Sequence, residues 1–170
     1  MKYAGIIEND IADSDDGISF SIWFQGCHFH CPGCHNQETW DFEGGKEIEY
    51  EALLEKIKEG LLANGVTRNL SLLGGEPLCK ENRKYVSKII HSLKSENKFD
   101  DVKIYCWTGY TKEELEKEND NNINYILQNI DTLVDGQFIL EKRNITLKLR
   151  GSSNQRIWKK ENGKLQLESE

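Results

Sequence analysis

Three cysteines within eight residues are the part of this sequence best suited to do chemistry. The segment holds three thiols and three imidazoles: Cys27, His28, His30, Cys31, Cys34 and His35. Thiolates and imidazoles are the protein ligands of zinc, haem iron and iron-sulfur clusters, and paired thiols also act in disulfide exchange. The segment therefore has four interpretations, which make different demands on the same side chains.

Two of these interpretations leave Cys27 without a role. Cys31-Pro32-Gly33-Cys34-His35 matches the C-x-x-C-H pattern of haem attachment, but c-type haem is attached outside the cytoplasm and we expect no export signal. Cys31 and Cys34 also have the spacing of a thioredoxin-like pair. Such a pair opens a helix, whereas residues 36–45 show no apolar helical face.

The other two interpretations use all three cysteines. A structural zinc site would take the three thiolates and one of the three histidines as tetrahedral ligands. An iron-sulfur cluster would take the C-x-x-x-C-x-x-C thiolates at three corners and leave the fourth iron open to an external ligand. The nine residues from 27 to 35 leave both hypotheses open.

A second motif, Leu73-Gly74-Gly75-Glu76-Pro77-Leu78, follows an apolar run. Two glycines let a backbone approach a ligand without a Cβ in the way, and Pro77 keeps the preceding residue out of a helix. A plain strand-to-helix turn would also explain the pattern. Because both motifs follow strands, they are expected at the edge where open α/β sheets bind ligands.

The elements that position these motifs alternate along the chain. Apolar runs predict strands at 18–24, 69–73, 102–107 and 132–134. Apolar residues at helical spacing predict helices at 50–61, 86–93 and 123–130, and a capping box at 111–114 opens a fourth. Such βαβ units predict an α/β fold with a mainly parallel sheet, as an open, partial βα barrel, because a complete eight-fold barrel needs about 250 residues. We expect one domain over residues 1–170, an additional strand at 145–149, and a polar C-terminal tail from about residue 159.

Composition excludes several classes of protein. The 170 residues are 37% hydrophobic, with a mean hydropathy of −0.67, too apolar for a disordered chain and too polar for a membrane protein. The formal net charge of −7 argues against nucleic acid as a partner. We expect a cytoplasmic protein with free thiols, in which Cys106 is a buried apolar residue and Cys79 is incidental.

The spacing of Cys27, Cys31 and Cys34, followed by Gly74-Gly75-Glu76-Pro77 after the next strand, resembles the radical S-adenosylmethionine superfamily. Further segments resemble one of its families, the activating proteins of anaerobic ribonucleoside-triphosphate reductases. They are Gln25-Gly26-Cys27, Cys31 to Asn36, Trp107 to Tyr110, Val134 to Phe138 and Arg150 to Gln155. Gly33 stands where the wider superfamily commonly has an aromatic residue, so the side chain that packs against adenine is left open.

The resemblance implies a radical S-adenosylmethionine domain whose Cys27, Cys31 and Cys34 hold a 4Fe-4S cluster. It implies S-adenosylmethionine contacts from Gly33, Cys34, His35 and the segment Gly74–Glu76, with no catalytic side chain beyond the cluster. The implied reaction is reductive cleavage to a 5'-deoxyadenosyl radical, which takes hydrogen from a glycine of the large reductase subunit. A flavodoxin-like electron donor is also implied. The alternatives are activation of another glycyl radical enzyme, of the pyruvate formate-lyase type, and a non-enzymatic zinc-binding module.

Overall fold

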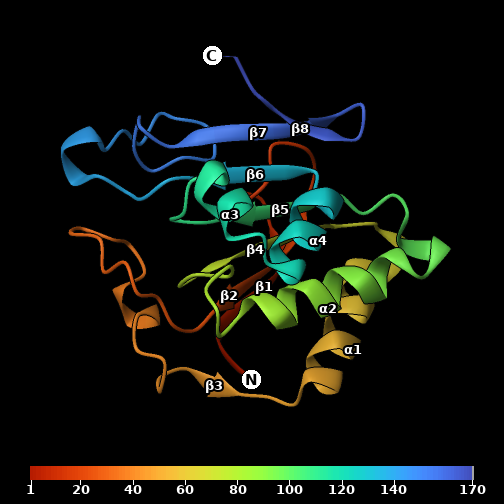
Figure 1. Cartoon of the computed structure of the whole chain (residues 1–170). Coiled ribbons are helices and arrows are strands. Elements are labelled where there is room, and N and C mark those ends of the chain that lie inside the picture. The colour runs from red at the N-terminus through yellow and green to blue at the C-terminus, as the bar shows by residue number, and fades with distance from the viewer. Residues whose placement is uncertain (170) are drawn as a thin grey trace.

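The chain forms an open α/β structure, and its computed structural model describes residues 1–169 as one sheet of eight strands with four α-helices (Figure 1). The strands are β1 (Lys2–Asp10), β2 (Ser19–Phe24), β3 (Lys46–Glu47), β4 (Asn69–Gly74), β5 (Ile104–Trp107), β6 (Thr132–Asp135), β7 (Arg156–Glu161) and β8 (Lys164–Leu167). The helices are α1 (Tyr50–Leu61), α2 (Arg83–Lys94), α3 (Lys112–Glu118) and α4 (Asn121–Asn129). No helix within residues 1–169 has both the length and the apolar character needed to cross a bilayer.

The centre of the sheet confirms the predicted βαβ pattern. Strands β2, β4, β5 and β6 are neighbours in that order and run parallel. The four predicted helices form between them, and the capping box is present, with the amide of Thr111 donating to the Glu114 carboxylate at 2.7 Å. Because the strands are parallel, the loops that leave their carboxyl ends gather at one edge of the sheet.

The expectation of a mainly parallel sheet is wrong at both edges. The pairs β1–β2, β1–β3, β6–β7 and β7–β8 are antiparallel, which leaves only three of the seven pairs in the sheet of residues 1–169 parallel. Strands joined by short connections, as β1–β2 and β7–β8 are, pair antiparallel because a parallel pair needs a long crossover. The sheet is therefore mixed.

Two predictions for the C-terminal part are also wrong. The residues from 159 onward, expected as a polar tail, belong to the sheet instead, because β7 and β8 make a hairpin against β6. Its turn contains Asn162 and Gly163, both at positive φ, which is the geometry of a tight hairpin turn. Residues 145–149 form turns and bends instead of a strand, and the side chain of Asn144 accepts hydrogen bonds from Thr146 at its start.

Alternation along the central strands divides the sheet into two faces. Phe20, Ile22 and Phe24 of β2 are fully buried in the core that the helices complete. Trp23, between them, points to the other face and lines a cavity there. The core thus lies on the helical side, and the opposite side is left for the site.

The loop between β1 and β2 is joined to the far edge of the sheet through the carboxylate of Asp15. This carboxylate accepts hydrogen bonds from the hydroxyl of Tyr105 and the ammonium of Lys159, both at 2.6 Å, and pairs with Lys148 at 2.7 Å. Although burial alone would raise the pKa of Asp15, these three donors hold it well below its usual range. The loop that precedes β2 is thereby fixed beneath the cavity.

Candidate metal centre

The cysteine segment is a loop that hydrogen bonds fix at both ends. Directly after β2, the amide of Gly26 donates to the carbonyl of Thr39 at 2.7 Å. The buried side chain of Gln25 donates to two backbone carbonyls within residues 38–41, at 3.0 and 2.7 Å. The loop therefore has defined ends, although it contains almost no regular secondary structure.

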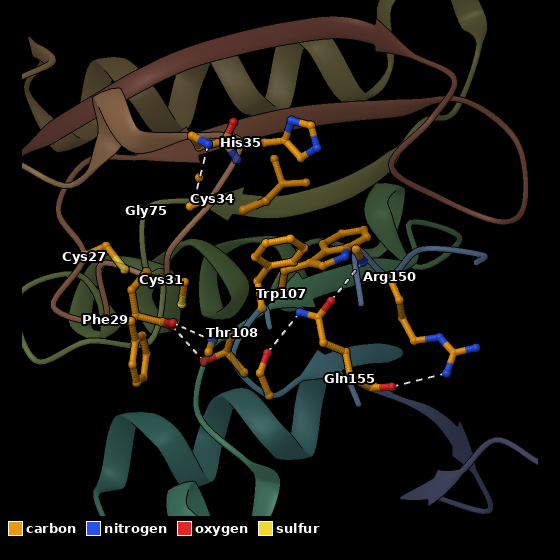
Figure 2. A pocket seen from close by; sticks show the side chains of 18 of the residues that line it. Cys27, Phe29, Cys31, Cys34, His35, Gly75, Trp107, Thr108, Arg150 and Gln155 are labelled. Atoms are coloured by element: carbon orange, nitrogen blue, oxygen red, sulfur yellow. Dashed lines mark hydrogen bonds between the residues drawn. The ribbon is translucent and has the colours of Figure 1, made fainter. Parts of the chain in front are cut away.

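The three thiols of this loop line one cavity of about 520 Å³ (Figure 2). Cys27 is buried, and Cys31 and Cys34 are half-buried. The thiol of Cys31 donates to Oε1 of Gln137 at 3.9 Å, and the amide of Asn36 donates to Sγ of Cys34 at 3.4 Å. Burial raises the pKa of the Cys27 thiol to about 11, so a bound metal would have to displace its proton.

The histidines of the segment do not join the thiols. His28 lies 3.1 Å from a carboxylate oxygen of Glu81, and the ring of His30 stacks on Trp40, with centroids 4.6 Å apart. Neither lines the cavity, whereas the exposed His35 does. Within residues 1–169, no three Cys, His, Asp or Glu side chains converge to hold a single metal ion.

The donor set fits a cluster better than one zinc ion. A zinc ion needs four ligands at about 2.0 to 2.3 Å from one point. A cubane cluster instead takes one thiolate at each of three irons, which three cysteines around the wall of one cavity can supply. The cavity volume also lies in the range of sites for small organic cofactors, about 300 to 1,000 Å³.

The Gly74–Glu76 segment is hydrogen-bonded directly to the chain around the cysteine loop. The amide of Gly75 donates to the carbonyl of Phe24 at 2.9 Å, and that of Glu76 donates to the carbonyl of Gly26 at 2.8 Å. A Cβ on Gly75 would lie 2.4 Å from the Gly26 carbonyl oxygen. The glycine at position 75 therefore makes room for the cysteine loop, which is a reason for a glycine in addition to the ligand approach expected from the sequence.

Glu76 braces the ends of two strands. Its side chain is 1% exposed, and its carboxylate accepts hydrogen bonds from the amide of Leu78 at 2.9 Å, the hydroxyl of Thr108 at 2.8 Å and the amide of Gly109 at 2.7 Å. Burial raises the pKa of Glu76 to about 7. The carboxylate thus ties the loop after β4 to the loop after β5 at the cavity wall.

Aromatic side chains supply much of the remaining wall. Trp23, Phe29, Trp107 and Phe138 all line the cavity, so several rings are available where Gly33 provides none. Gly33 itself has φ +75°, and a Cβ there would lie 2.7 Å from a methyl carbon of Leu140, which explains the glycine at this position.

The segment between β6 and β7 forms a further part of the wall, and its residues Arg150 and Gln155 lie away from Cys27 and Cys31. Figure 2 shows Arg150 and Gln155 there, with Trp107 between them and the cysteines in this view. The indole of Trp107 donates to the carbonyl of Leu149 at 2.8 Å. Four lining residues, Asp13, Trp23, Leu147 and Leu149, were not among the residues predicted for the site, whereas Phe138 ends a segment that carries the family resemblance. Only Trp23 had a usable signal, because it alternates with the core residues of its strand.

The two remaining cysteines lie away from the cavity. Cys79 and Cys106 are fully buried and are absent from its lining, and Cys106 packs in the core beneath the helices. Neither thiol therefore lies with the three thiols of the cysteine loop.

Comparison with known proteins gives a consistent result. A family model described as "4Fe-4S single cluster domain" matches residues 15–158. An anaerobic ribonucleoside-triphosphate reductase-activating protein of Vibrio cholerae is 37% identical over 158 residues, covering 92% of this chain and 97% of its own. Proteins of the same name are 30% identical in Enterobacteria phage T4, covering 96% and 97%, and 32% identical in Escherichia coli K12, covering 91% and 96%.

The close approach at Gly75 predicts a defect in the cysteine loop. Gly75→Ala should force the Gly26 carbonyl away, lower the free energy of unfolding by about 1 to 3 kcal/mol and reduce iron and sulfide bound after anaerobic reconstitution. Gly5→Ala is the matched control, because a Cβ there meets nothing within 4 Å. Full cluster content in Gly75→Ala, with loss of cofactor binding alone, would favour the ligand-approach interpretation.

The burial of Glu76 predicts a pH dependence of stability in the metal-free protein. Its pKa is about 7 in the folded chain against an ordinary 4.5, so the folded state holds the additional proton between these values. The free energy of unfolding should therefore fall as pH rises from 4.5 to 7, by about 1 to 3 kcal/mol. Glu76→Gln should reduce this slope in urea titrations to the part that Asp13 contributes, because burial also raises the pKa of Asp13 to about 7. Glu59→Gln on the exposed face of α1 should leave the slope unchanged.

Proposed function

The chain belongs to the family of anaerobic ribonucleoside-triphosphate reductase-activating proteins, and on this premise we propose that it is the enzyme that produces a glycyl radical on the reductase. The observation that carries the proposal is the pair of hydrogen bonds that joins the Gly74–Glu76 segment to the chain around the cysteine loop. They hold a three-thiol donor set and a glycine-rich cofactor segment at one cavity.

In this proposal, Cys27, Cys31 and Cys34 hold a 4Fe-4S cluster. Gly33, Cys34, His35 and the segment Gly74–Glu76 contact S-adenosylmethionine beside it. Support comes from their placement, because the three thiols, His35 and the segment all line the same cavity, while Gly33 lies in the same loop. The parallel strands β2, β4, β5 and β6 then correspond to the partial barrel of the radical S-adenosylmethionine fold.

When bound, the reduced cluster supplies the electron that cleaves S-adenosylmethionine to methionine and a 5'-deoxyadenosyl radical, which takes a hydrogen atom from the reductase glycine. The chain's own residues position the two cofactors and shield them from solvent. Trp23, Leu73 and Trp107 form apolar walls around the inner part of the cavity, and its open side is closed to water only when the partner docks. The hydrogen bonds that the Glu76 carboxylate accepts from Thr108 and Gly109 keep these walls at a fixed distance from the thiols.

The partners follow from the same reaction. The glycine belongs to the large subunit of the reductase and must enter the cavity from outside, between the cysteine loop and the segment after β6. The electron is supplied by a flavodoxin-like donor, since the three cavity cysteines provide for one cluster and the buried Cys79 and Cys106 provide for no second. We propose a cytoplasmic site of action, where these thiols stay reduced.

The ligand assignment predicts that all three loop cysteines are required. Cys31→Ala should lose most of the iron and sulfide bound after anaerobic reconstitution, because its thiolate has no substitute in the cavity. Cys106→Ala, which changes a buried cysteine outside the cavity, is the control and should load fully. A colourless wild-type protein with one tight zinc ion would instead identify a zinc-binding module.

The reaction predicts cofactor cleavage that depends on the partner protein. Formation of 5'-deoxyadenosine should rise when the reductase is added, because the partner closes a cavity that is otherwise open to other hydrogen donors. Deuterium from α-deuterated glycine in the reductase should appear in the 5'-deoxyadenosine, alongside a glycyl doublet in electron paramagnetic resonance. Equal cleavage without any partner would refute the proposal. If the doublet formed only on an enzyme of the pyruvate formate-lyase type, the proposed protein substrate would be wrong, but the proposed radical reaction would stand.

A further inference from the structure

We propose that the loop of residues 137–150, called here the rim loop, is the surface on which the reductase docks, through acidic and apolar side chains of the reductase. The inference rests on the proposed function, since it names the surface by which that partner reaches the cavity. It is carried by the position, charge and exposed apolar side chains of the loop.

The rim loop forms the part of the cavity wall that lies beside the cysteines. Phe138, Leu147 and Leu149 line the cavity from this loop, and Leu140 lies against Gly33 of the cysteine loop. Figure 1 shows the rim loop, in light blue, and the cysteine loop, in orange, extending from the same side of the sheet, away from α1 and α2. A polypeptide segment entering the cavity on this side therefore has to pass over the rim loop.

The charge of the rim loop is opposite to that of the whole protein. It contains Lys142, Arg143, Lys148 and Arg150 but only one carboxylate, Glu141, for a formal charge of +3 in a chain of net charge −7. Lys148 pairs with Asp15, whereas the exposed side chains of Lys142 and Arg143 form no ion pair with residues 1–169. Two unpaired cations beside the cavity favour a partner surface that carries carboxylates.

Two apolar side chains of the rim loop are exposed as well. Ile145 is 83% exposed and Leu140 is 46% exposed. A surface that combines exposed aliphatic residues with unpaired cations offers both the buried contacts and the long-range attraction of a protein interface. The partner face that fits it is apolar at its centre and acidic around it.

The outer side chains can be changed without disturbing the fold. Backbone bonds hold the base of the loop, with the amide of Asn144 donating to the carbonyl of Gly151 at 3.0 Å and that of Ser153 donating to the carbonyl of Lys142 at 2.9 Å. These bonds do not involve the side chains of Lys142, Arg143 or Ile145. Substitutions there should therefore report on binding and not on stability.

The test measures affinity of the cluster-loaded protein for the large anaerobic ribonucleoside-triphosphate reductase at several salt concentrations. The double variant Lys142→Glu/Arg143→Glu should raise the Kd at least tenfold at low salt and flatten its salt dependence. Ile145→Ser should raise the Kd several-fold at every salt concentration. Iron content and S-adenosylmethionine binding, measured without the partner, should be unchanged in both. The matched control, Lys56→Glu/Lys94→Glu, makes the same charge change on exposed positions of α1 and α2 and should leave the Kd within twofold.

A Kd within twofold of wild type for the rim-loop double variant would overturn the docking surface, and so would equal weakening in the helix control, because the effect would then follow total charge. Neither result would contradict the proposed function, radical generation on the reductase. If the wild-type protein neither binds the reductase nor forms a glycyl radical on it, the proposed function itself fails, and the docking surface fails with it.

Discussion

The site depends on one backbone contact, the hydrogen bond from the amide of Glu76 to the carbonyl of Gly26. Through it, the loop that follows β4 and the loop that follows β2 meet at van der Waals distance, which only a glycine at position 75 allows. The parallel pairing of β2 with β4 brings the two loops to the same edge, and the Glu76 carboxylate extends the connection to the loop after β5. The ends of three neighbouring strands are therefore held as one unit, and this unit fixes the positions of the thiols.

Sequence patterns predicted the elements whose signals are local. The helix at 50–61 follows from the spacing of Leu53, Ile57 and Leu61, which all enter the core. Strand β1 had no such signal, because its first residues are half-buried and its polar end is mostly exposed. The C-terminal hairpin did have one, the Asn162-Gly163 pair, but the surrounding lysines and glutamates gave the strands a polar appearance. These two strands need little apolar surface of their own, since β7 pairs with β6 and the edge strand β8 pairs with β7.

Some parts of the candidate site could be predicted from the sequence and others could not. The thiol spacing and the glycine pair identify the two loops, but not that each loop is the other's nearest neighbour. The role of Glu76 depends on donors 32 and 33 residues away, in Thr108 and Gly109, and no local pattern reports such a partner. The contribution of Leu147 and Leu149 to the wall could not be predicted either, because irregular loops have no periodicity that separates an inner from an outer side chain.

The Asp15 carboxylate links positions that are far apart in the chain, since its partner Lys159 lies 144 residues later. Contacts between residues so far apart in the chain form late in folding, because the entropy of the intervening chain must be lost before the contact can stabilise the fold. During synthesis, both lysines that pair with this carboxylate, Lys148 and Lys159, leave the ribosome long after the loop beneath the cavity. The cavity wall is completed only by residues as late as Gln155, so a chain terminated before β6 carries all three cysteines but lacks the wall that the segment after β6 supplies.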